Sequence, residues 1–95
     1  MVNTNNQGQE ELKTLLTTHR AAFVHWVDPT SYSPWQSIAD ARELECMAQW
    51  SLGWITYDSP GKMVLALTLA HDHLHVADKI VLPGGCIKQI INVKI

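Results

Sequence analysis

The sequence is poor in charge, in cysteine and in long apolar runs, and each shortage excludes a class of protein. Charged residues make up 17% of the chain, below the quarter or so that is typical. Seven basic and nine acidic residues give a net charge of −2, so the basic surface that drives non-specific nucleic-acid binding is missing. The longest apolar run, Met63 to Ala70, is too short to cross a bilayer. We therefore expect no membrane partner.

Cysteine occurs only at Cys46 and Cys86, which is too few for a disulfide framework and has no metal-like spacing. We predict that both are small, buried and reduced. The segment from Met1 to Glu11 has neither the basic start nor the apolar stretch of a signal peptide. These features together predict a cytoplasmic protein.

The length of 95 residues predicts one domain with a modest core. Apolar residues make up 46% of the chain, and with so few charges there is little polar surface to cover them. This composition favours an oligomer, whose interfaces bury the excess apolar surface.

Residues 1–9 are polar and are predicted to be disordered, and residues 10–95 are predicted to form the single domain. Within that domain, Leu12, Leu15, Leu16 and His19 follow helical spacing, which predicts a short N-terminal helix over residues 10–19. Residues 22–27 are aromatic and β-branched, which predicts a strand.

The segment after this strand is harder to interpret. Ser33 and Pro34 are typical of an N-cap and a first helical residue, so we predict a single helical turn or a structured loop that ends near Ala41. Trp35 is expected to pack this excursion onto the body of the domain. Residues 47–57 are predicted to be a long strand with a bulge or bend at Gly53, while a helix over residues 38–50 is the alternative.

The remaining chain alternates between strands and turns. A turn over residues 58–61 precedes a strand over residues 63–70, whose two faces are both apolar and are expected to be covered. Strands at residues 76–82 and 87–95 flank a corner at Pro83 to Gly85, where glycine is expected to supply a positive φ. The sequence thus predicts a mainly β fold, a small closed or nearly closed barrel.

The candidate chemistry is sparse. His71, His73 and His75 could ligate a transition metal from one side of a strand, but a solvated turn explains the same residues and is favoured. His25 near Asp28 could act as a general base, although a half-buried strand residue is favoured. No hydrolase, metalloprotease or phosphate-loop motif is present. We predict a non-enzymatic protein with no catalytic residue, no metal and no cofactor.

Two further features leave alternatives open. Trp26, Trp50 and Trp54 could stack on the bases of single-stranded nucleic acid, but a role in the core or in an interface is favoured because no Lys or Arg alternates with them. The glycines of the Pro83 to Gly85 corner could approach a phosphate, but a corner without a ligand is favoured.

The order of the predicted elements resembles that of the Sm-like family, whose fold is an N-terminal helix on a strongly bent five-stranded, SH3-like barrel. Small phage proteins, cyanophage proteins among them, share a similar pattern of short motifs. The matching segments here are Val24–Asp28, Trp35, Ser51–Trp54, Val64–Leu69 and Ile80–Ile90. The resemblance covers residues 10–95 and implies a phage origin, with the host-cell cytoplasm as location.

The resemblance also implies a homo-oligomeric ring of five to seven subunits, in which the fourth strand of one subunit pairs with the fifth strand of the next. An apolar edge strand is suited to such pairing. The interface residues expected on this basis are Val76, Asp78, Ile80, Leu82, Ile87, Gln89, Ile91 and Val93.

RNA is the ligand that the resemblance implies, bound by two loops that correspond here to residues 58–61 and 82–86. These loops keep Asp58 and a glycine but lack the Asn and Arg of the family, so no residue is assigned to RNA. The leading hypothesis is an oligomeric Sm-like module with RNA as a candidate partner. The alternative is a structural or protein-interaction barrel without a nucleic-acid role.

Overall fold

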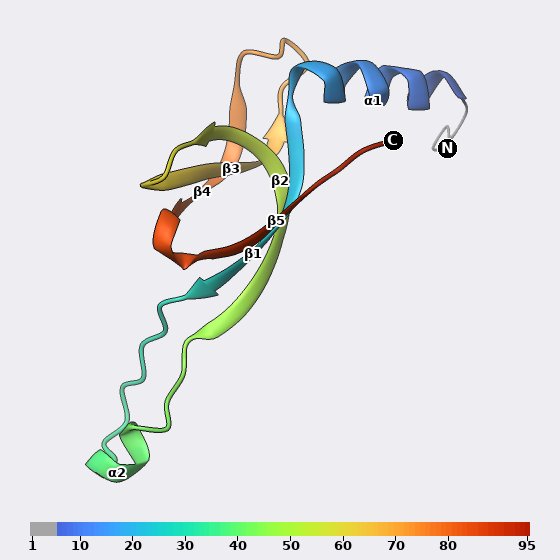
Figure 1. Ribbon diagram of the computed structural model, residues 1–95. Coiled ribbons are helices and arrows are strands. Elements are labelled where there is room, and N and C mark those ends of the chain that lie inside the picture. The colour runs from blue at the N-terminus through green and yellow to red at the C-terminus, as the bar shows by residue number, and fades with distance from the viewer. Residues whose placement is uncertain (1–5) are drawn as a thin grey trace, which may run out of the picture.

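The computed structural model describes residues 6–95, and their fold is mainly β (Figure 1). Five antiparallel strands form one sheet in the order β4-β3-β2-β1-β5. The elements are α1 (Asn6–Thr18), β1 (Arg20–Asp28), α2 (Ile38–Ala41), β2 (Met47–Asp58), β3 (Lys62–Leu69), β4 (Val76–Pro83), the 3₁₀ turn η1 (Gly84–Cys86) and β5 (Ile87–Asn92).

The N-terminal helix is confirmed, and it begins at Asn6 rather than at residue 10. Of the nine residues predicted to be disordered, residues 1–5 lie outside the described residues and residues 6–9 are helical. Leu15 and Leu16 are half-buried on one side of the helix, as the spacing of its apolar residues requires. Neither α1 nor α2 is long and apolar enough to cross a membrane.

The sheet is open, so the predicted closure into a barrel does not occur within the described chain. The strands β4 and β5 follow one another in sequence but lie at opposite edges of the sheet. The core is correspondingly small, and its buried apolar side chains are Ala22, Val24, Met63, Leu65, Ala66 and Leu82. The prediction that β3 is covered on both faces is wrong for its second half, because Leu67 is 67% exposed.

The predicted long, bent strand is confirmed as β2, and the helix considered for residues 38–50 ends at Ala41. The pairing of β1 with β2 runs through Gly53 without a shift, so Gly53 is not a bulge. A Cβ at Gly53 would lie 2.6 Å from the Ala66 carbonyl oxygen, so glycine is needed for the close approach of β3. In the pairing of β2 with β3, the register shifts between Ile55 and Tyr57. A bulge of this kind increases strand curvature.

The corner between β4 and β5 is the 3₁₀ turn η1, and no glycine in the described residues has a positive φ. The expectation of a left-handed glycine here was therefore wrong. A Cβ at Gly84 would collide with the Pro60 carbonyl oxygen, and the Gly84 N–H donates to the Gly61 carbonyl at 2.9 Å. Glycine is required because the β4–β5 corner packs against the β2–β3 turn.

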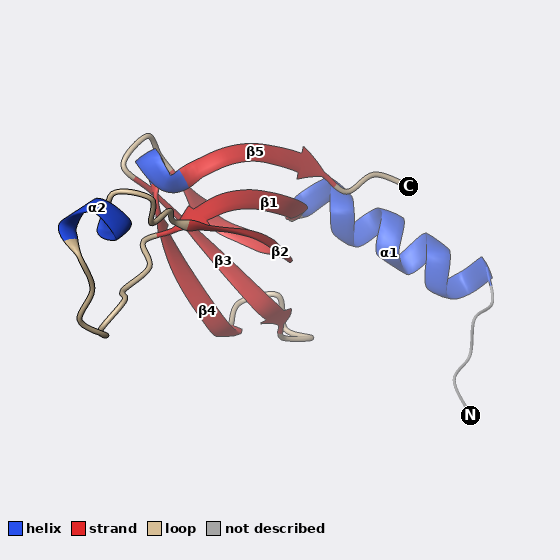
Figure 2. Cartoon of the chain, turned by 90° about the horizontal axis from the view of Figure 1, so that it is seen from below, coloured by secondary structure: helices blue, strands red, loops and turns tan. Residues whose placement is uncertain are grey.

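The segment between β1 and β2, residues 29–46, projects from the sheet as an arm that carries α2 at its tip (Figures 1 and 2). The N-cap of α2 is Ser37, whose Oγ accepts from the Asp40 N–H at 3.1 Å, and not Ser33 as the Ser-Pro pair suggested. The packing predicted for Trp35 is wrong, because its side chain is fully exposed. The predicted burial of Cys46 is also wrong, since this free thiol lies exposed in the arm, while the free Cys86 is half-buried.

Candidate self-association interface

Seven of the eight residues that the sequence analysis assigned to an interface lie in the two edge strands, and the eighth, Val93, directly follows β5. In the described sheet, β4 pairs only with β3, and β5 pairs only with β1. Each edge therefore presents backbone N–H and C=O groups on its outer side, which is the arrangement that a further strand can join. The regular part of β4 is its second half, because Asp78 has a φ of 56° and interrupts the ladder opposite Leu67.

The structure places the assigned side chains in different environments. Leu82 is 1% exposed and Ile87 packs against the same core, so these two contribute to the subunit rather than to a contact surface. Asp78, Ile80, Gln89 and Ile91 are exposed, and Val76 and Val93 are half-buried. Val81 was not assigned, yet it is 58% exposed and is the most exposed large apolar residue of β4.

An apolar row crosses the outer face of the sheet, opposite to the core. Phe23 of β1 pairs with Leu52 of β2 on one side and with Ile91 of β5 on the other. These three side chains are 44%, 52% and 46% exposed. Cross-strand neighbours on one face contact one another, so the row forms a continuous apolar strip that ends at the β5 edge.

The next row on this face is aromatic. His25 stacks on Trp50 with ring centroids 4.6 Å apart and planes 12° apart. The two side chains are therefore partners on the outer face, where Trp50 remains 54% exposed. Trp26 lies on the inner side, packs against the core and donates its Nε1–H to Ser51 Oγ at 3.0 Å.

A hollow of about 360 Å³ separates α1 from the outer face of the sheet. Its walls are almost entirely apolar, and the apolar row of Phe23 and Leu52 forms part of its floor. The residues that line it are Leu12, Leu16, Ala21, Phe23, Leu52, Gly53, Trp54, Leu67 and Val93. We call it the α1 hollow.

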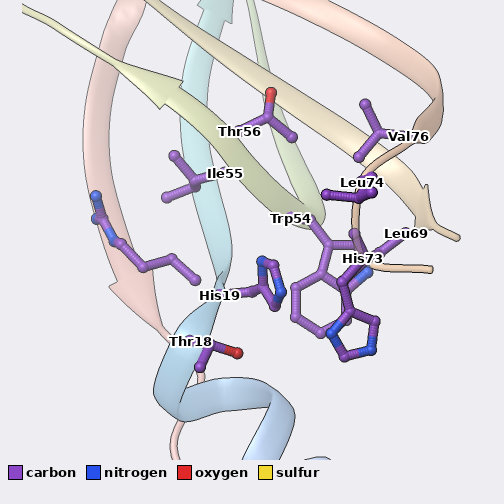
Figure 3. Close-up of a pocket in the computed structure, with 10 residues that line it drawn as sticks. Thr18, His19, Trp54, Ile55, Thr56, Leu69, His73, Leu74 and Val76 are labelled. Carbon is purple, nitrogen blue, oxygen red and sulfur yellow. The ribbon is translucent and has the colours of Figure 1, made fainter. Parts of the chain in front are cut away.

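A second, more polar hollow of about 460 Å³ lies where α1 passes into β1 (Figure 3). His19 and His73 meet there edge to face with centroids 5.2 Å apart, beside Trp54. Among residues 6–95, no three His, Cys, Asp or Glu side chains are grouped so that they could hold a metal ion. The hollow thus brings together the rings of His19, His73 and Trp54.

The histidine-rich segment forms an ordered turn around Asp72. The Asp72 Oδ1 accepts from the Leu74 N–H at 2.8 Å and from the His75 N–H at 3.2 Å, and Oδ2 lies 2.7 Å from His75 Nδ1. The Leu74 N–H, followed by the His75 side chain, lowers the pKa of the Asp72 carboxyl below its ordinary value. The site is exposed, as expected for a solvated turn.

No protein-family model, no curated protein and no solved structure matches this chain.

Proposed function

We propose that the protein is a non-enzymatic, self-associating module, and that the edge strand β4 of one subunit pairs with the edge strand β5 of the next. The observation that carries the proposal is the open sheet with two apolar edges. Val81 and Ile91 are exposed at these opposite edges, and both belong to strands with one free side. Pairing β4 with β5 between copies would satisfy the edge backbone groups and extend one sheet across subunits.

The contact joins two different surfaces, so it is head-to-tail. Contacts of this kind close into rings or extend into filaments, whereas two identical edges give a dimer. A ring of five to seven subunits is the assembly that the Sm-like resemblance implies, and the strand order and the 3₁₀ turn between β4 and β5 are compatible with it.

A mixing experiment tests this pairing. Val81→Lys places a charge on the β4 edge and Ile91→Lys places one on the β5 edge, at side chains that are already half exposed. Each variant alone is expected to be a monomer of 10.7 kDa by light scattering. The reason is that every copy of one variant has the same intact edge, and the edge with which it would pair carries the added charge. An equimolar mixture is expected to form a heterodimer of twice this mass, through the intact β4 of one variant and the intact β5 of the other.

The same experiment distinguishes other contacts. If β4 paired with β4, Ile91→Lys would remain associated on its own, and the mixture would contain no new species. That outcome, or variants that keep the wild-type mass, would contradict the proposal. Circular dichroism and the melting temperature of each variant serve as the folding control.

RNA is a second candidate, and one observation favours it. The two loops that the resemblance assigns to RNA lie in contact through the Gly84 N–H and the Gly61 carbonyl. Against it, the Asp58 carboxylate is paired with Arg20 Nη1 at 3.1 Å. Binding of poly-U and poly-A near 100 mM salt tests RNA: a ligand held by phosphate contacts would show affinity that falls steeply with salt, and the absence of binding would remove this candidate.

A further inference from the structure

The arm of residues 29–46 is an ordered extension with an apolar tip. At its base, Thr30 Oγ1 accepts from the Met47 N–H at 3.1 Å and donates to the Asp28 carbonyl at 2.9 Å. Farther out, the Tyr32 hydroxyl donates to the Glu45 carbonyl at 3.1 Å and joins the two sides. The arm is therefore held in shape by its own hydrogen bonds.

The tip exposes apolar side chains that a monomer does not cover. Trp35 is fully exposed and Ile38 is 77% exposed. The tip and α1 lie at opposite ends of the molecule in both views (Figures 1 and 2), so the tip does not reach the α1 hollow of its own chain. An exposed Trp beside an aliphatic residue is typical of an interface anchor.

Charge identifies the kind of partner. The arm with its base, residues 28–46, contains Arg42 against Asp28, Asp40, Glu43 and Glu45, a net charge of −3. This charge is repelled by nucleic acid and by anionic lipid. Residues 59–95 of the same chain carry the opposite charge, a net +2 from Lys62, Lys79, Lys88 and Lys94 against Asp72 and Asp78. Of these lysines, Lys94 directly follows Val93, which lines the α1 hollow, so it is the one that can complement the acidic arm of another copy.

The exposed surface area of the chain also favours a second copy as the partner. The chain exposes 7462 Å², against about 5,500 Å² for a compact monomer of its mass. The excess of about 2,000 Å² is roughly twice the ~800 Å² that one partner buries in a standard interface. Edge pairing of two short strands covers only part of this surface, so a second contact between copies is needed to bury the rest.

We propose that the arm is a clasp whose tip, Trp35 with Ile38, inserts into the α1 hollow of a second copy. The hollow is apolar and has a volume of about 360 Å³, within the range of pockets that bind compact apolar groups. It adjoins the β5 edge through Val93, and Lys94 follows that residue as a counter-charge for the acidic arm. The clasp depends on the proposed self-association and adds a second contact between the subunits.

Disulfide trapping tests the clasp. In a background of Cys46→Ser and Cys86→Ser, the pair Ile38→Cys with Leu67→Cys places one thiol at the tip and one in the hollow. Mild oxidation at low micromolar concentration is expected to give covalent multimers of this variant. The matched control pairs Ile38→Cys with Tyr57→Cys, which is also half exposed but does not line the hollow, and it is expected to stay largely uncross-linked.

A second variant separates the clasp from edge pairing. Trp35→Ser with Ile38→Ser removes the apolar tip without touching the core, so the melting temperature of the dissociated subunit is expected to be unchanged. Its assembly is expected to dissociate at a protein concentration at least tenfold higher than that of the wild type. A Ser variant with wild-type assembly, or equal cross-linking in both cysteine pairs, would overturn the clasp and leave edge pairing standing.

Two other outcomes also bear on the clasp. If the wild type is monomeric throughout, both the clasp and the edge pairing fail. If the tip instead binds vesicles of neutral phosphatidylcholine, seen as a blue shift of Trp fluorescence that the Ser variant loses, then lipid is the occupant and the clasp is wrong.

Discussion

At the residue scale, Gly53 determines how closely β2 and β3 can approach. A side chain there would meet the Ala66 carbonyl oxygen and the Leu65 side chain, which belong to the small core. Backbone atoms cannot move aside as the end of a flexible side chain can, so the strands must separate to admit a methyl group.

We therefore expect Gly53→Ala to lower the free energy of unfolding by about 1–3 kcal/mol, the usual range for overpacking. Gly85→Ala is the matched control, because a Cβ at Gly85 meets nothing within 4 Å and its φ is not positive. Urea unfolding of both variants at one protein concentration measures the difference. Equal stability of the two variants would show that the close approach at Gly53 is not required.

Asp72 provides a pH-dependent prediction at the same scale. Its pKa is lowered in the folded chain, chiefly by the Leu74 N–H and then by His75. The stabilisation by this carboxylate is therefore present above the unfolded pKa of about 3.9 and is lost as the pH falls through the lower folded pKa.

NMR titration of the Asp72 carboxyl carbon is expected to give a midpoint below 3.8, the ordinary value. His75→Ala is expected to raise this midpoint only part of the way, because the larger contribution comes from the Leu74 N–H. A midpoint at or above the ordinary value in the wild type would contradict the hydrogen-bonded turn.

At the scale of the elements, alternation identified all five strands and helical spacing identified α1, because each of these elements has one side that is less exposed than the other. Alternation along the strand predicted for residues 22–27 puts Phe23 and His25 on the face opposite Val24, and the structure has the same division. The apolar row on the outer face could thus have been predicted from the sequence, given the pairing of the strands.

The arm could not be predicted in this way. Trp35 was expected to be buried because large aromatic residues usually are, but the arm has its own hydrogen bonds and does not fold back. The cap of α2 is Ser37 rather than Ser33. Both serines lie near the helical turn, and the residue preference at N-cap positions does not distinguish between them. The edge positions of β4 and β5 depend on long-range pairing, which single-strand patterns do not contain.

At the scale of the whole molecule, acidic residues are concentrated in the arm, and exposed apolar side chains are spread over several surfaces. The molecule extends over 59 × 33 × 21 Å, with the acidic arm at one end and α1 at the other (Figure 2). In the part of the chain that the structure describes, six apolar residues are buried in the core, while larger apolar side chains lie on the outer face, at the edges and at the arm tip. This distribution is typical of a subunit whose fold is completed by its neighbours.

The mass of the wild-type protein in solution tests the central claim most directly. Multi-angle light scattering across concentrations from about 1 to 100 μM is expected to show a discrete species of several times 10.7 kDa. Dissociation on dilution is expected to be accompanied by a loss of stability, because the subunit alone has a small core. A single species of 10.7 kDa at the highest concentration, with a melting temperature independent of concentration, would contradict self-association.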